Sequence, residues 1–274
     1  MVEFWKSAKR NRLLRAGGSA ILLAAVLGGC GTPAIDTVQS GDFVTASDES
    51  LARKRARIRL ELAVGYYNDG KTTIALDELK QSIAADPSLL EAHNLRGLIY
   101  MRLNDLGLAE ESFRKALQID PQAAAVEHNY GWLLCQQGRT AESFRHFQTA
   151  IANPSYADKA KSLMTLGVCQ SKAGQKPEAE QSLQKAFELD ATNPVIGYNL
   201  ALLLYQRGEF TRSLFYVRRI NNSEFANAES LWLGIRIERK LGNTEAVGQL
   251  GTQLKKRFPQ SNEASLYDRA VFND

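Results

Sequence analysis

Residues 90–123 read LEAHNLRGLIYMRLNDLGLAEESFRKALQIDPQA, and the same pattern recurs along most of the 274-residue chain. The small residue in the second half of this unit has counterparts at steps of 34, 34, 36, 34 and 34 residues. The six positions are Ala75, Ala109, Ser143, Ala179, Ser213 and Val247. A fixed period of about 34 residues predicts a solenoid in which each repeat is a helix–turn–helix unit.

Two further positions repeat in register with this small residue. Five residues before it lies a residue that tolerates the left-handed backbone of a helix end. These turn positions are Gly70, Asn104, Gly138, Gly174, Gly208 and Gly242. Twelve residues before it lies a second small position, filled by Ala63, Gly97, Gly131, Gly167, Ala201 and finally Ile235. We therefore predict an all-α, right-handed superhelical solenoid of about six repeats of the tetratricopeptide (TPR) type.

The pattern also sets the expected boundaries of the solenoid. The repeats extend over residues 53–261, and the two-residue excess of the one longer step lies near residues 153–156. Residues 262–274 form a short amphipathic pattern, which predicts a capping helix. Such a cap is expected because the outer face of a terminal repeat has no neighbour.

The N-terminus carries a pattern typical of secreted lipoproteins. Residues 1–29 place five basic residues before the apolar run Ala20–Leu27, which is too short to span a bilayer. The sequence LGGC at residues 27–30 resembles the bacterial lipobox. That resemblance implies that Cys30 receives a lipid, and Gly31 in place of Asp favours the outer membrane. A transmembrane anchor is the alternative.

The composition changes once this leader is set aside. The full chain has a net charge of +4, but without the leader it has 29 Lys and Arg against 29 Asp and Glu. This balance gives no argument for nucleic-acid binding. Residues 30–52, rich in small and polar residues, are predicted to be the lipidated N-terminus and a flexible tether. We interpret the basic run Arg53–Arg59 as solvated first turns of a helix, with a contact to lipid head groups or envelope polymers as the alternative.

The phase of the repeats predicts a binding groove. In a TPR superhelix, one face of the first helix of each repeat lines a concave surface. The apolar and aromatic residues expected there are Leu60, Val64, Tyr67, Leu98, Met101, Trp132, Met164, Val168, Tyr198, Leu202, Tyr205 and Trp232. The same face includes Asn94, His128, Cys135, Ser171, Arg236 and Arg239. An exposed apolar surface of this size is typical of an interaction site, so we expect an extended segment of a partner protein there. The alternative is that individual positions are buried between repeats.

No residue pattern indicates catalysis. The three histidines, His93, His128 and His146, have no Cys or carboxylate at metal-ligand spacing. The sequence also lacks a nucleophile elbow, a phosphate-binding loop and a Gly-rich dinucleotide turn. We therefore expect a protein without enzymatic activity, metal, cofactor or small-molecule substrate.

Cys135 and Cys169 lie 34 residues apart, in the first helices of the third and fourth repeats. Adjacent first helices lie side by side, and an oxidising compartment permits a disulfide between them. The inserted residues shift the phase between these helices, so the Cα separation could miss the window of roughly 4.4–6.8 Å that a disulfide needs. A disulfide and two separate buried thiols are therefore both open.

Two stretches give the chain a family resemblance. They are AESLWLGIRIER at residues 228–239, followed by Leu241-Gly242, and FPQS at residues 258–261, followed by Glu263-Ala264 and Leu266-Tyr267. Together with the lipobox and the six repeats, they resemble the PilW/PilF family of type IV pilus biogenesis lipoproteins.

The resemblance implies a pilotin at the outer membrane that faces the periplasm. In this role the protein helps subunits of the secretin PilQ to reach the membrane and assemble, or it stabilises the pilus. The implied partners are PilQ-like subunits and other pilus-assembly proteins. The alternative is a general envelope TPR lipoprotein that scaffolds other periplasmic complexes, such as peptidoglycan synthases.

Overall fold

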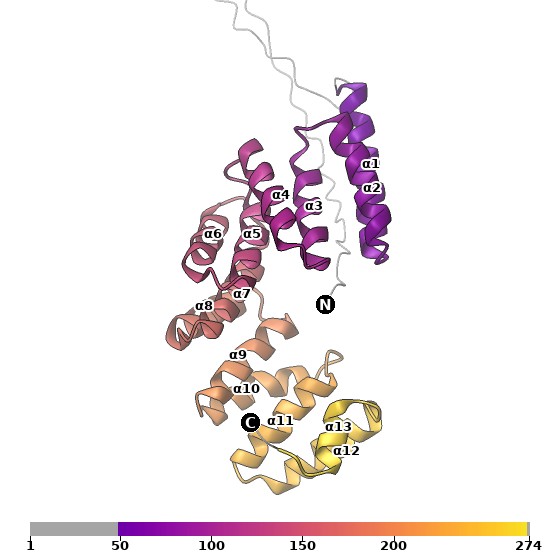
Figure 1. Cartoon of the computed structure of the whole chain (residues 1–274). Helices are drawn as coiled ribbons and strands as arrows, with labels where there is room; N and C mark the ends of the chain where they lie inside the picture. Colours follow the sequence, from indigo (N-terminus) through magenta and orange to yellow (C-terminus); the bar gives the residue numbers. More distant parts are fainter. Residues whose placement is uncertain (1–48, 273–274) are drawn as a thin grey trace, which may run out of the picture.

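The computed structural model of the chain describes residues 49–272, in which all regular structure is helical. Twelve helices form six consecutive pairs, and α13 (Asn262–Asp268) follows the last pair. The pairs are α1 (Leu51–Asn68) with α2 (Thr72–Ala85), α3 (Leu90–Arg102) with α4 (Leu106–Ile119), α5 (Ala124–Gln136) with α6 (Thr140–Ala152), α7 (Lys159–Lys172) with α8 (Lys176–Leu189), α9 (Pro194–Gln206) with α10 (Phe210–Asn221), and α11 (Ala228–Lys240) with α12 (Thr244–Arg257). Figure 1 shows the pairs following one another along an arc. The predicted TPR solenoid is confirmed.

The turn inside each pair depends on a left-handed residue. The predicted turn positions all have positive φ: Gly70 (76°), Asn104 (60°), Gly138 (75°), Gly174 (80°), Gly208 (79°) and Gly242 (76°). This backbone closes the first helix, because the following residue can donate to a carbonyl five residues back, as the Lys71 N–H does to Tyr66 O at 2.8 Å. The local sequence therefore ends each first helix at the same point of the repeat.

The two small positions bring the helices of one pair into close contact. Both are buried in the third repeat, where the Ser143 hydroxyl on α6 donates to the Gly131 carbonyl on α5 at 2.8 Å. In the fifth repeat Ser213 makes the same bond to Ala201 at 2.6 Å. A serine at this position is thus small enough for the close contact, and its buried hydroxyl is satisfied.

We expect the close contact in the second repeat to tolerate no added methyl group. A Cβ at Gly97 would lie 2.5–2.8 Å from ring carbons of the fully buried Phe113. Gly97→Ala should lower the free energy of unfolding by about 1–2 kcal/mol, since overpacking outweighs the gain in helix propensity. Gly65→Ala is the matched control, because a Cβ there meets nothing within 4 Å and should stabilise α1 by up to about 1 kcal/mol. Urea unfolding of both variants measures the difference, and equal shifts would contradict the expectation.

The ends of the solenoid differ from the expected boundaries. Helix α1 begins at Leu51, two residues before the expected start, because the Ser50 hydroxyl accepts from the Arg53 N–H at 3.1 Å and caps it. The helix expected over 262–274 ends at Asp268. It ends there because Ala270 takes a left-handed backbone with φ of 52°. The capping element is therefore one short helix followed by a turn.

The one longer step of the repeat lies between α6 and α7. This link has six residues, 153–158, whereas the link between α4 and α5 has four, 120–123.

No helix within residues 49–272 has the length and apolar character needed to cross a membrane. The expected leader, Cys30 and the tether up to residue 48 lie outside the described residues.

Candidate functional site

The twelve residues predicted for the groove all lie on the first helices of the pairs, α1, α3, α5, α7, α9 and α11. Ten of them are half-buried, while Val64 is 41% exposed and Tyr205 is only 6% exposed. Several touch the buried clusters between repeats, as Trp132 does beside Phe147 and Leu166. Eleven of the twelve predicted residues thus keep part of their side chain accessible to solvent.

Three positions expected on the groove face are buried instead. The Tyr205 ring is covered by the Arg236 guanidinium, 4.6 Å from its centroid, and by the Phe210 ring at 5.5 Å. His128 and Cys135 are 5% and 8% exposed. For these three positions the alternative, burial between helices, holds, because side chains of the same repeat and of the following one cover them.

Basic side chains cover several of the groove aromatics, which the sequence alone did not indicate. The Arg102 guanidinium lies 4.3 Å from the centroid of the Tyr67 ring, and its Nη1 donates to the Tyr67 carbonyl at 2.8 Å. The Lys172 ammonium lies 5.3 Å from the centroid of Trp132. In both cases the cation comes from the first helix of the following repeat. A basic residue, Arg102 or Lys172, directly follows the last predicted groove position of the second and fourth repeats. This recurrence is the sequence signal that could have predicted that basic side chains cover the aromatic rings.

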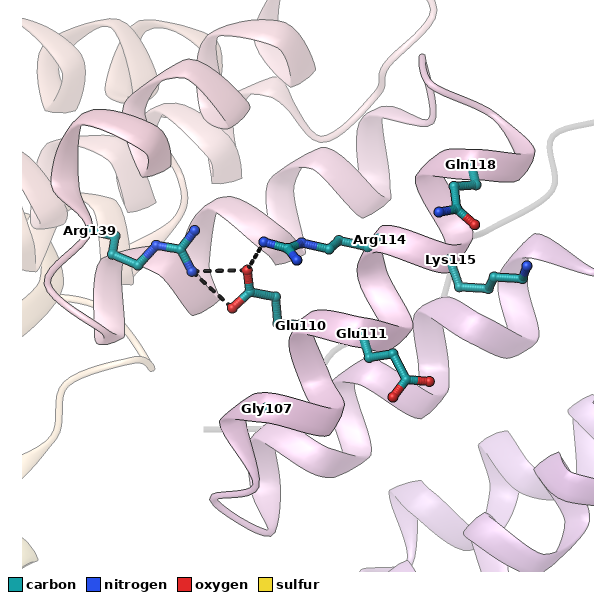
Figure 2. A pocket seen from close by; sticks show the side chains of 7 residues that line it. All are labelled: Gly107, Glu110, Glu111, Arg114, Lys115, Gln118 and Arg139. Atoms are coloured by element: carbon teal, nitrogen blue, oxygen red, sulfur yellow. Dashed lines mark hydrogen bonds and ion pairs between the residues drawn. The ribbon is translucent and has the colours of Figure 1, made fainter.

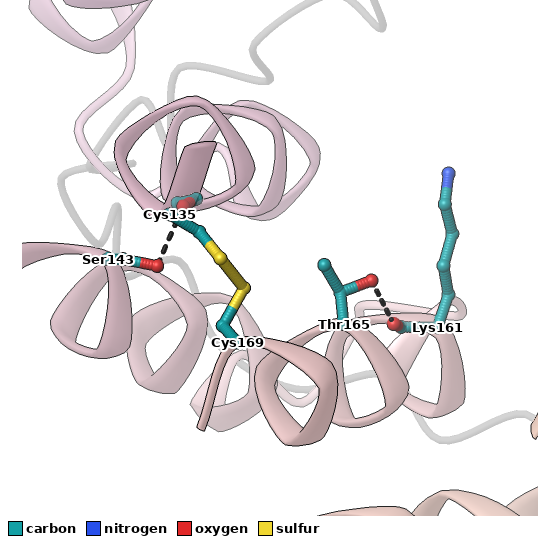
Figure 3. Close-up of a disulfide and its surroundings, with 6 residues drawn as sticks. Cys135, Ser143, Lys161, Thr165 and Cys169 are labelled. Carbon is teal, nitrogen blue, oxygen red and sulfur yellow. Dashed lines mark hydrogen bonds between the residues drawn. A yellow bond between two sulfur atoms is a disulfide. The ribbon is translucent and has the colours of Figure 1, made fainter. Parts of the chain in front are cut away.

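A disulfide joins two neighbouring first helices, α5 and α7. Cys135 on α5 and Cys169 on α7 are bonded with an S–S distance of 2.02 Å and a Cα separation of 6.0 Å. Figure 3 shows this bond bridging the two helices. It connects the third and fourth repeats, on either side of the longer link. The two additional residues of this link therefore do not prevent the disulfide, because the Cα separation stays inside the range that the bond needs.

The buried His128 is held neutral. Its Nδ1 lies 2.8 Å from the Ser162 hydroxyl, and its ring lies edge-on to Phe147 at 5.6 Å. Burial, together with the nearby positive charge of Lys161, lowers the pKa of His128 to about 3. The native state therefore does not take up a proton at this histidine until the solution is strongly acidic.

We expect this histidine to make the fold less stable as the pH falls below about 6.5. The unfolded chain binds a proton near pH 6.5, whereas the native His128 binds one only near its own pKa of about 3. The contribution of neutral His128 to stability is thus complete above about pH 6.5 and is lost progressively as the pH falls from there toward about 3. Between pH 7 and pH 5 the free energy of unfolding should fall by about 2 kcal/mol on account of His128.

Urea unfolding of the wild type and of His128→Gln at both pH values measures the effect. The variant should lose about 2 kcal/mol less between the two pH values. Burial also lowers the pKa of His93, but this residue is present in both proteins and contributes equally to their pH dependence. An identical pH dependence for the two proteins would contradict the assignment.

A charged cavity of about 600 Å³ lies on the second-helix side, away from the groove. Figure 2 shows Glu110 between Arg114 and Arg139, with ion-pair distances of 2.6 and 2.9 Å. Burial would raise the pKa of Glu110, but hydrogen bonds from Arg139 and Tyr130 outweigh it and hold that pKa below its usual range. This network connects α4 to the start of α6. Because its charges pair with each other, we assign it a structural role.

No arrangement for metal chemistry is seen in the described part of the chain. Residues 49–272 contain no cluster of three His, Cys, Asp or Glu side chains that could hold a metal ion. The partly exposed apolar side chains on the first helices are therefore taken as the candidate site.

Known proteins resemble the chain over most of its length. Two segments, residues 60–124 and 160–193, match models of the tetratricopeptide repeat. The type IV pilus assembly protein PilF of Pseudomonas aeruginosa is 28% identical over 242 residues, which cover 88% of this chain and 93% of that protein. A solved structure of Pseudomonas aeruginosa PilF has a TM-score of 0.70 at 26% identity and covers 80% of this chain and 99% of its own. A solved structure of PilW, described as a widely conserved type IV pilus biogenesis factor, has a TM-score of 0.71 at 31% identity. The match covers 77% of this chain and 96% of the PilW chain.

Proposed function

Because the chain belongs to the PilW/PilF family of TPR proteins of type IV pilus biogenesis, we propose that it acts as a pilotin for the pilus secretin. In this proposal a lipid on Cys30 anchors the protein to the outer membrane, facing the periplasm. The groove binds PilQ-like secretin subunits and promotes their assembly into multimers. The protein makes and breaks no covalent bond in this role.

The observation that carries the proposal is the set of partly exposed apolar side chains on the six first helices, with aromatic rings on α1, α5, α9 and α11. Residues such as Leu98, Trp132 and Tyr198 keep part of their apolar surface in contact with solvent. A strand-like partner segment would remove this surface from water, which is favourable by about 25 cal/mol per Å². Aromatic rings are the side chains most often found among binding hot spots.

The membrane anchor adds to this binding through local concentration. Subunits captured close to one membrane surface meet each other far more often than subunits that diffuse through the periplasm. A flexible tether of about 20 residues would let the solenoid stand roughly 25 Å from its lipid. The proposed mechanism therefore combines retention, capture and a raised effective concentration of subunits.

Deletion of the gene tests the proposal. Heat-resistant secretin multimers should disappear from the outer membrane and return when the wild-type gene is supplied. The variant Cys30→Ala should lose metabolic labelling with palmitate and restore few multimers at the outer membrane. Normal multimers in the deletion strain would refute the pilotin role, and a loss of pili and twitching motility in that strain would assign pilus stabilisation instead.

A further inference from the structure

The first repeat leaves an apolar seam of α1 open to solvent. Leu51, Ile58 and Leu62 are 79%, 58% and 43% exposed. Arg55 and Gly65 are exposed as well, and together the five residues follow one another at alternating steps of four and three. This is the spacing of a narrow seam along one side of a helix, as in a coiled coil. Figure 1 shows α1 at the end of the arc of helix pairs.

The position of Ile58 is buried in every later repeat. Its counterparts at the repeat period are at most 1% exposed, and they are Ala92, Val126, Ser162, Ile196 and Ser230. The preceding repeat contributes to this burial. The Ser162 hydroxyl on α7 lies 2.8 Å from His128 Nδ1 on α5, and Ile196 on α9 packs beside Ala186 on α8. No repeat precedes α1 within residues 49–272, so Ile58 lies on the face that such a repeat would cover.

The two ends of the solenoid differ in this respect. Terminal repeats normally present a polar outer face to water. At the C-terminal end, α13 packs on the last pair, and its Ala264 shares a buried cluster with Leu254 of α12. At the N-terminal end, leucine and isoleucine side chains stay in water. Removing them from water is favourable, so we expect a partner on this face.

The charges beside the seam indicate which partner fits. The arginines around it are paired within the chain, as Arg53–Asp86, Arg57–Glu49 and Arg59–Glu78. Lys54 and Glu61 have no ion-pair partner among residues 49–272. They lie seven residues apart, on the same flank of the seam. Opposite charges at equivalent positions of one helix attract when that helix meets an antiparallel copy of itself.

We propose that this seam binds a second copy of the chain, with the two α1 helices antiparallel about a two-fold axis near residues 56–58. Leu51 of each copy then packs against Leu62 of the other. Lys54 of each copy faces Glu61 of the other. Every contact occurs twice, as in any isologous interface.

Arg55 distinguishes this arrangement from a parallel one. In a parallel pair the two Arg55 side chains lie directly opposite each other, where like charges repel. In the antiparallel pair Arg55 lies opposite Ile58 of the other copy. Its aliphatic stem can cover that side chain while the guanidinium stays in water. The charges therefore select the antiparallel orientation.

Only one helix of each chain takes part, so we expect a weak and reversible dimer. Attachment of both copies to one membrane, as proposed above, would raise their effective concentration. The inference itself does not depend on the pilotin role. A monomeric protein refutes the dimer alone, whereas normal secretin multimers in the deletion strain refute the pilotin role alone.

Sedimentation equilibrium of the chain as the cell produces it, in density-matched detergent, tests the inference. The wild type should show a monomer–dimer equilibrium between about 1 and 200 μM. Ile58→Ser should raise the dissociation constant at least about tenfold, because it places a polar group at the centre of both halves of the seam. Ile74→Ser is the matched control, since Ile74 on α2 is 45% exposed, as is its counterpart Leu108 at 39%, and lies outside the seam. This variant should change the constant by less than about twofold.

Charge reversal tests the orientation. Lys54→Glu and Glu61→Lys should each raise the dissociation constant at least about tenfold, because each makes both ion pairs repulsive. The two changes together restore opposite charges and should return the constant to within about threefold of the wild type. Circular dichroism spectra confirm that the variants are folded.

Three outcomes would overturn the inference. They are a monomeric wild type, equal effects of Ile58→Ser and Ile74→Ser, and no rescue by the double charge reversal. A monomer that binds vesicles of phosphatidylethanolamine and phosphatidylglycerol, and loses this binding in Ile58→Ser, would assign the seam to a lipid surface and would also overturn it.

Discussion

Replacing Trp132 and Tyr198 together with alanine is expected to weaken the binding of secretin subunits by at least about a hundredfold. Both side chains are half-buried, on α5 and α9, so each offers one part of its ring to a partner and is held in place by the other. Truncating a central aromatic hot spot typically costs about 2 kcal/mol or more. Titration of purified secretin periplasmic fragments against the wild type and the variant measures the loss.

The matched control removes two exposed aromatic rings that are not among the predicted groove residues. Phe215 on α10 and Phe225 in the following link are 58% and 41% exposed. Phe215→Ala with Phe225→Ala should change the affinity by less than about fivefold, since these rings lie outside the groove. Undiminished binding by the groove variant, or an equal loss in both variants, would contradict the assignment of the groove.

Replacing Cys135 and Cys169 with serine is expected to lower the free energy of unfolding by about 3–4 kcal/mol. The bond closes a loop between residues 34 positions apart, and the lost constraint on the unfolded chain has about this value in the chain-entropy treatment. For a domain of this size the melting temperature should fall by roughly 10 °C. Urea unfolding under oxidising conditions measures the change.

A solenoid gives this bond a second effect. Repeats contact only their neighbours, so the third and fourth repeats form the one connection between the two halves of the molecule. Without the disulfide we expect the unfolding transition to broaden, as the halves begin to unfold separately. Reduced wild-type protein should behave like the variant, and the variant should not respond to reductant. A shift below about 1 kcal/mol would contradict the expected contribution.

The turn positions show how much of the fold the sequence determines. Gly70 and its five counterparts all adopt the left-handed backbone expected of them. The small residues at Gly97 and Ala109 are buried where their helices meet. These features depend on local backbone preference and on contacts within one repeat, so a sequence period of about 34 residues is enough to predict them.

The contacts between repeats could not be predicted in the same way. Tyr205 was expected to face the groove, yet Arg236 of the next repeat covers its ring. Phe272 stacks on the Trp232 ring of α11 after the chain turns at Ala270. A periodic pattern contains no information on such long-range contacts.

The sequence by itself determined the number of repeats and the position of the left-handed turn that closes the first helix of each pair. Only the tertiary structure decided which of the predicted groove residues are covered, that Cys135 and Cys169 are bonded, and that Arg236 and Arg239 stack on the Tyr205 and Phe272 rings. The physical reason is the range of the interactions. Helix caps and turns depend on neighbouring residues, whereas the distance and rotation between successive repeats depend on how all their side chains fit together.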